Sequence, residues 1–207
     1  MPIPLPTTIG GRIERRWSCF LIFRARHDRF GCALMSLEIT PGNLSNMTLS
    51  PIETDDRKPV IDIFNHYIES SFAAYLDQPV PYGFFDTLMH LCGDLPSFAA
   101  RNDAGELVGF GLLRPYHPSA VFAKTAEITY FLRLGETGNG IGRKLLDALL
   151  SAARERGLTS ILASVSSANE GSIRFHEKNG FVRCGNFCRI GEKKGRTFDV
   201  VYLQKVL

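Results

Sequence analysis

The hydrophobic pattern of the chain changes its period once between residues 126 and 157. Residues 126–134 are largely apolar and short enough for a buried strand. One face of a helix then follows, formed by Ile141, Leu145, Leu146, Leu149, Leu150 and Ala153, which recur three to four residues apart. Gly157 is placed to end that helix. The pattern therefore predicts a strand, a loop and a helix in this order.

The remaining periodic segments extend the same alternation along the chain. A helix is expected from Thr54, which suits an N-cap, a second helix after Pro81, and a third from about Ser172. Further strands are expected near 48–52, 98–101, 107–113, 159–165, 181–190 and 197–204. Strands that alternate with helices in this way predict an α/β architecture around a mixed sheet.

The loop between the central strand and its helix has the chemistry of an anion site. Gly138, Gly140 and Gly142 alternate, so consecutive backbone N–H groups can converge on a phosphate at the positive end of a helix. The ATP-binding loop needs a Lys-Ser/Thr pair, and the dinucleotide loop needs G-x-G-x-x-G; neither pattern is present. The glycines could also simply shape a tight connection.

Two motifs resemble a known family. Gly138–Gly142 resembles the acetyl-CoA pyrophosphate loop of the GNAT N-acetyltransferase superfamily, Arg/Gln-x-x-Gly-x-Gly/Ala, except that Thr137 occupies its first position. Asn169–Phe181 is similar to the segment N-x-x-S-x-x-x-H-E-K-x-G-F of the branch that includes phosphinothricin and methionine sulfoximine acetyltransferases. Shorter segments that resemble the same branch are Asn65–Ser71, Thr125–Glu127 and Gly195–Val200.

The resemblance implies a GNAT fold, in which a mixed central sheet with splayed central strands is flanked by helices. It also implies acetyl-CoA as co-substrate and a homodimer. The residues expected to bind the cofactor are Tyr130, Phe131, Leu132, Gly138, Asn139, Gly140, Ile141, Gly142, Arg143, Asn169 and Ser172. Of these, residues 130–132 would offer main-chain groups to the pantetheine arm. Asn169 and Ser172 could equally cap a helix.

Two side chains are candidates for the chemistry of acyl transfer to an amine. The resemblance implies that Glu127, on the central strand, is the base that removes a proton from the amine. Alternatively, Glu127 lies on the solvent face or pairs with a neighbour such as Lys124. His176 is expected to protonate the CoA sulfur, or else to be a structural histidine.

The expected acceptor is the primary amine of a small molecule, such as an amino acid, phosphinothricin or methionine sulfoximine. Tyr75, Phe72, Phe122 and Lys124 are the candidate substrate-binding residues. The branch typically has an arginine near Tyr75 and another near Lys124, and this chain lacks both, which leaves Lys124 or Arg114 to compensate. The alternatives are an enzyme that acetylates a peptide or protein and a non-catalytic sensor of acyl-CoA.

Charge and composition separate the first 46 residues from the rest of the 207-residue chain. Residues 1–46 carry six arginines against three acidic residues, which accounts for the whole net charge of +3. We expect a poorly ordered extension over 1–46 and an acetyltransferase domain over 47–207. The neutral domain lacks the basic footprint of a nucleic-acid-binding protein. The apolar stretch 17–23 is far shorter than a membrane-spanning helix.

The five cysteines are odd in number and contain no C-x-x-C pair. We therefore expect reduced thiols, no metal site and a cytoplasmic protein.

Overall fold

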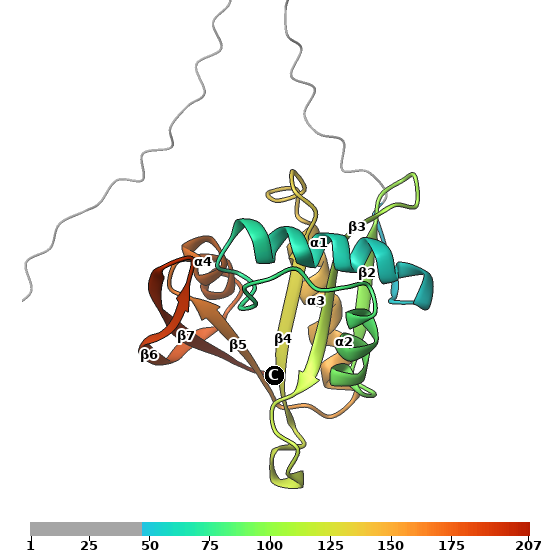
Figure 1. Cartoon of the computed structure of the whole chain (residues 1–207). Helices are drawn as coiled ribbons and strands as arrows, with labels where there is room; N and C mark the ends of the chain where they lie inside the picture. Colours follow the sequence, from blue (N-terminus) through green and yellow to red (C-terminus); the bar gives the residue numbers. More distant parts are fainter. Residues whose placement is uncertain (1–46) are drawn as a thin grey trace, which may run out of the picture. The chain divides into compact units, whose positions relative to one another are not determined.

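The computed structural model describes residues 47–207, which form a seven-stranded mixed sheet with helices on both faces (Figure 1). The strand order is β1-β2-β3-β4-β5-β7-β6, and of the paired strands only β4 and β5 run parallel. The strands are β1 (Thr48–Pro51), β2 (Ser97–Arg101), β3 (Leu107–Pro115), β4 (Thr125–Leu132), β5 (Ser160–Ser166), β6 (Val182–Lys193) and β7 (Arg196–Val206). The helices are α1 (Arg57–Ser70), α2 (Phe84–Cys92), α3 (Ile141–Glu155) and α4 (Glu170–Lys178), with short 3₁₀ turns η1 (Thr54–Asp56) and η2 (Ala120–Phe122).

Both faces of the sheet are covered, which explains the nearly continuous apolar pattern of β4. On one face Phe131 packs in a buried cluster with residues of α1 and α2. On the other face Ile128 packs against Leu146 and Leu149 of α3. Every residue of the apolar stripe predicted for α3 is buried. The sequence therefore identified correctly the helix that follows the glycine loop.

The start of α1 differs from the expectation. Thr54 does not cap this helix, because the chain first makes the turn η1 and α1 begins at Arg57. Asp56 instead accepts a hydrogen bond from the backbone N–H of Glu53 and forms an ion pair with Arg101. Glu53 and Asp56 thus form a capping box around η1, and Arg101 of β2 adds a tertiary contact at the residue just before α1.

The sheet opens between β4 and β5. These strands pair at only three positions, where Thr125–Glu127 faces Ser160–Leu162. Beyond them β4 continues to Leu132 along β3, and β5 continues to Ser166 along β7. Figure 1 shows the two strands diverging at this point. The splayed centre expected of the fold is confirmed, and it leaves strand-edge N–H and C=O groups inside the sheet.

The expected extension over 1–46 lies outside the described residues, so the domain boundary stays a prediction. Within residues 47–207 no helix is long and apolar enough to cross a membrane. In the same part of the chain no group of three His, Cys, Asp or Glu side chains could hold a metal ion. Cys92 is buried, whereas Cys184 and Cys188 are free and exposed on β6.

Candidate active site

The loop before α3 presents a row of unpaired backbone N–H groups. Gly135, Gly138 and Gly140 have φ angles of 87°, 85° and 79°, a conformation in which other residues are strained. Gly140 is the N-cap of α3, and the first N–H of the helix with a backbone partner is that of Lys144. None of the backbone N–H groups of residues 138–143 donates a hydrogen bond within the described chain; only the side chain of Arg143 does. This geometry suits a bound phosphate.

A groove of about 710 Å³ lies beside this loop, between the end of β4 and helix α4. The predicted cofactor residues that line it are Tyr130, Phe131, Leu132, Gly138, Gly140, Gly142, Arg143, Asn169 and Ser172. Asn139 and Ile141 do not line it, and Ile141 is buried against Leu145. Arg143 and Lys178 bring positive charge to the groove, and Arg143 is also in an exposed ion pair with Asp147.

Asn169 and Ser172 combine the two roles that the sequence left open. The Asn169 side chain accepts a hydrogen bond from the Ser172 N–H at 3.2 Å and caps α4. Both residues also line the groove. Capping therefore holds these polar groups at the entrance of α4, on the side that faces the glycine loop.

A second cavity of about 310 Å³ opens from the splay of the sheet on the side of α2. It shares with the groove the residues Ala73, Tyr130, Phe131, Asn169 and Ser172. Most of its other lining is apolar or aromatic, including Tyr75, and Arg114 contributes a guanidinium. The cavity therefore meets the end of the groove at Tyr130 and Phe131. We call it the acceptor cavity.

Glu127 is buried and forms an ion pair with Arg114, which lies directly opposite on β3. The Glu127 side chain is only 9% exposed, whereas that of Arg114 is 43% exposed and lines the acceptor cavity. Burial raises the pKa of Tyr75, in the wall of that cavity, to about 12, and the nearby charges of Tyr202 and Glu127 add to the shift. The carboxylate thus lies beside the cavity and not on a solvent face. Its partner is Arg114 and not the Lys124 considered from the sequence.

His176 is 3% exposed, and both of its ring nitrogens have partners. Nδ1 lies 2.8 Å from the carbonyl oxygen of Ser172, and Nε2 lies 2.7 Å from the hydroxyl oxygen of Tyr130. Burial lowers the pKa of His176, and the hydrogen bond to Ser172 opposes this shift in part. The neutral ring therefore donates from Nδ1 and accepts the Tyr130 hydroxyl at Nε2. Burial also raises the pKa of Tyr130.

The four predicted substrate residues are placed differently from one another. Tyr75 lines the acceptor cavity. Phe72 packs against Phe198 instead, and Phe122 packs against exposed aromatic rings in the β3–β4 connection. Lys124 is exposed, just before β4. The structure does not bring Phe72, Phe122 or Lys124 to the cavity.

Lys193 is a residue of this region that sequence reasoning missed. Its side chain is buried, and Nζ donates hydrogen bonds to the carbonyl oxygens of Ser71 at 3.0 Å and Ala74 at 2.8 Å. Burial lowers the pKa of this lysine. A lysine in a polar hairpin carries no signal of burial in the sequence. Here it ties the segment that forms one wall of the acceptor cavity to β6.

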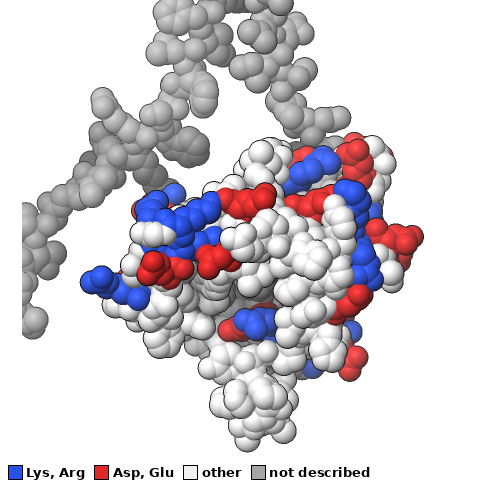
Figure 2. All heavy atoms as spheres, viewed as in Figure 1, with Lys and Arg blue, Asp and Glu red and all other residues white. Residues whose placement is uncertain are grey.

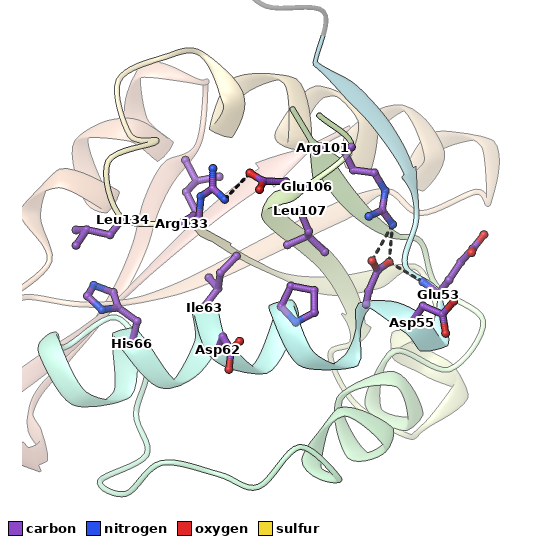
Figure 3. Close-up of a pocket in the computed structure, with 14 residues that line it drawn as sticks. Glu53, Asp55, Asp62, Ile63, His66, Arg101, Glu106, Leu107, Arg133 and Leu134 are labelled. Atoms are coloured by element: carbon purple, nitrogen blue, oxygen red, sulfur yellow. Dashed lines mark hydrogen bonds and ion pairs between the residues drawn. The ribbon is translucent and has the colours of Figure 1, made fainter. Parts of the chain in front are cut away.

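Another cavity, of about 800 Å³, lies elsewhere, between α1 and the β2–β3 turn (Figure 3). Five carboxylates line it, from Glu53, Asp55, Asp56, Asp62 and Glu106. Its two arginines are already paired, Arg101 with Asp56 and Arg133 with Glu106. The excess of negative charge makes this cavity a poor site for a phosphorylated cofactor. Figure 2 shows charges of both signs mixed along the margin of the face, around a largely uncharged middle.

Comparison with known proteins agrees with this geometry. The family model described as "Acetyltransferase (GNAT) family" matches residues 60–181. An L-methionine sulfoximine/L-methionine sulfone acetyltransferase of Pseudomonas aeruginosa is 30% identical over 153 residues, covering 72% of this chain and 88% of that protein. A phosphinothricin N-acetyltransferase of Streptomyces coelicolor is 28% identical over 171 residues, covering 81% of this chain and 99% of that protein.

Two solved structures of acetyltransferases are similar to this chain in fold. One is a ribosomal-protein-alanine N-acetyltransferase from Brucella melitensis, with 27% identity and a TM-score of 0.73, covering 77% of this chain and 99% of that chain. The other is the YncA protein of Salmonella typhimurium, solved with its cofactor acetyl-CoA. It has 27% identity and a TM-score of 0.71, and the match covers 78% of this chain and 94% of that chain.

Proposed function

This chain belongs to the acetyltransferase (GNAT) family, and from that premise we propose that it acetylates the primary amine of a small molecule. It is an N-acetyltransferase, with acetyl-CoA as co-substrate. The acceptor is an amino acid or an analogue such as methionine sulfoximine or phosphinothricin, and its amine attacks directly within a ternary complex. The names of two relatives support this choice of acceptor.

The observation that carries the proposal is the junction of the two cavities. Small-molecule sites have volumes of roughly 300–1,000 Å³, and the acceptor cavity, at about 310 Å³, lies at the small end of that range. It meets the larger groove at Tyr130 and Phe131, where β4 has already parted from β5. A small acceptor and a long cofactor can therefore approach each other from opposite sides.

The residues of the groove fit acetyl-CoA. The free N–H groups of residues 138–143 suit its diphosphate, and Arg143 and Lys178 add positive charge nearby. The main-chain groups of β4 beyond Glu127 lack a partner on β5 and are available to the amides of the pantetheine arm. Bound there, acetyl-CoA supplies the activated acetyl group.

Glu127 is the proposed base. An amine is protonated near neutral pH and must lose a proton before its lone pair can attack. Glu127 is a buried carboxylate beside the acceptor cavity, and a buried charge without a role or partner is costly. Its carboxylate accepts the proton, directly or through water.

His176 acts through Tyr130 in this proposal. Both imidazole nitrogens are already hydrogen-bonded, so the ring has no free position from which to reach a sulfur atom. The Tyr130 side chain borders both the groove and the acceptor cavity. Its hydroxyl protonates a departing thiolate when its one proton turns from Nε2 of His176 to the sulfur atom. The O–H bond then breaks, and the phenolate that is left takes up a proton from solvent before the next turnover. His176 positions the hydroxyl between turnovers.

A screen of acetyl-CoA-dependent thiol release tests the function. The acceptors are free amino acids, methionine sulfoximine, phosphinothricin, polyamines and short peptides. We expect release with at least one small amine, and mass spectrometry should find its N-acetyl product. Peptides that outcompete every free amine would indicate a protein acetyltransferase. Tight acetyl-CoA binding with no release from any amine would indicate a non-catalytic sensor.

A further inference from the structure

The ion pair between Arg114 and Glu127 connects the proposed base to the acceptor cavity, but only one of its two partners borders that cavity. Arg114 borders the cavity, whereas Glu127 lies behind it and is not among the lining residues. Arg114 is the one permanently charged side chain in the described lining; the other ionisable groups there are His176 and the phenols of Tyr75 and Tyr130. An anionic group that enters the cavity therefore meets a single guanidinium, and this guanidinium is already paired.

The pairing has a consequence for catalysis. The Oε2 atom of Glu127 contacts the Arg114 guanidinium, so this oxygen is not free to take a proton from an amine. Glu127 is therefore partly masked as a base for as long as Arg114 contacts it. A guanidinium has donors enough for two carboxylates, and at 43% exposure the Arg114 side chain has room to move.

We propose that Arg114 is the acceptor-recognition residue and that an anionic group on the acceptor draws it away from Glu127. The inference rests on the proposed function, and it identifies the acceptor class as amines that also carry a carboxylate or a similar anion. The acceptor carboxylate takes over the guanidinium. The acceptor ammonium then gives one proton to the freed Glu127 carboxylate, which leaves a neutral amine and a neutral carboxylic acid. Charge is conserved, and no further reactant is needed.

Arg114 is on β3, opposite the base, so its recognition of the acceptor is coupled to release of Glu127. An amine without an anionic group gains neither the contact nor the release.

Direct binding gives the sharpest test, because it does not depend on turnover. L-methionine sulfone and its carboxamide, which keeps the amine but has a neutral amide in place of the carboxylate, are titrated calorimetrically into the CoA-saturated protein. Glu127→Gln removes the competing carboxylate, and we expect it to tighten binding of the sulfone several-fold while leaving the carboxamide unchanged. Adding Arg114→Gln to that variant should weaken binding of the sulfone about 10- to 100-fold. Unchanged or weaker binding of the sulfone to the Glu127→Gln protein overturns the proposal.

Turnover gives the second arm, with Arg183→Gln as the matched control because Arg183 forms an exposed ion pair with Glu177. Wild type should prefer the sulfone to the carboxamide, and Arg114→Gln should abolish that preference. If wild type acetylates the sulfone and Arg114→Gln retains the preference, the proposal is wrong and the proposed function stands. If only amines without an anionic group are acetylated, the proposal is again wrong and the proposed function again stands. If nothing is acetylated, the proposed function fails and the titrations alone decide on Arg114.

Discussion

Replacing Tyr130 with phenylalanine tests the contact on which the proposed proton path depends. The substitution removes one hydroxyl and leaves the ring, so packing against Phe175 is preserved. It also leaves Nε2 of His176 without its donor at 2.7 Å, in a ring that is only 3% exposed. A buried polar atom without a partner costs about 1–3 kcal/mol. We therefore expect the free energy of unfolding to fall by about 1–2 kcal/mol.

Urea unfolding at pH 8, where His176 is neutral, measures this cost. Tyr82→Phe is the control, because its hydroxyl bonds Asp62 at an exposed position, and we expect a change within about 0.5 kcal/mol. In a His176→Leu background Tyr130→Phe should cost much less, since the partner is already gone. Equal costs in the two backgrounds would refute the hydrogen bond.

Kinetics then separate structure from catalysis. Loss of a proton donor should lower kcat by about 100-fold or more, with little change in the KM for acetyl-CoA. Unchanged kcat in a less stable Tyr130→Phe protein would make the pair purely structural.

Four further predictions follow from the site. Glu127→Gln should lower turnover by about 100-fold or more while calorimetry shows acetyl-CoA binding nearly intact; unchanged turnover would remove Glu127 from the mechanism. Gly140→Ala and Gly135→Ala each force a residue into the left-handed region at a cost of about 1–2 kcal/mol. Steady-state kinetics should show a raised KM for acetyl-CoA only for Gly140→Ala, which lies in the groove; equal KM values would argue against the loop as the phosphate site. Because burial lowers the pKa of His176 below its usual value of about 6.5, the unfolded chain takes up a proton first as the pH falls. Urea unfolding between pH 8 and 5 should therefore show stability present above about pH 6.5 and lost below it, and His176→Leu should flatten that slope; an unchanged slope would contradict a buried neutral ring. Lys193→Met removes two hydrogen bonds to the segment of Ser71 and Ala74, so the KM for the acceptor should rise while that for acetyl-CoA holds. Lys58→Met, at an exposed ion pair, is its control, and equal effects of the two variants would show that the hydrogen bonds of Lys193 have no role in acceptor binding.

The parts of the fold that follow local rules could be predicted from the sequence. The stripe of α3 and the glycine loop before it depend only on residues close together in the chain, and both appear where the periodicity indicates. The splay of β4 from β5 was expected only through the family resemblance. Thr54 does not cap α1, because the capping box is formed by Glu53 and Asp56, and Asp56 also pairs with Arg101, forty-five residues away.

The contacts between the side chains of the site could not be predicted in the same way. Arg114 faces Glu127 because of the register between β3 and β4, and the loop that joins those strands leaves that register open in the sequence. Tyr130 and His176 are forty-six positions apart and meet only when α4 packs on the sheet. Phe72 resembles a cavity residue by type, yet its ring packs edge-on against Phe198.

A crystal structure of the protein with acetyl-CoA tests the central claim most directly. The account predicts that the diphosphate lies on the N–H groups of residues 138–143 and that the arm follows β4 past Leu132 toward Tyr130. Its acetyl group should then lie at the mouth of the acceptor cavity. A cofactor bound away from the glycine loop, or an acetyl group on the side of the sheet away from Arg114 and Glu127, would contradict it.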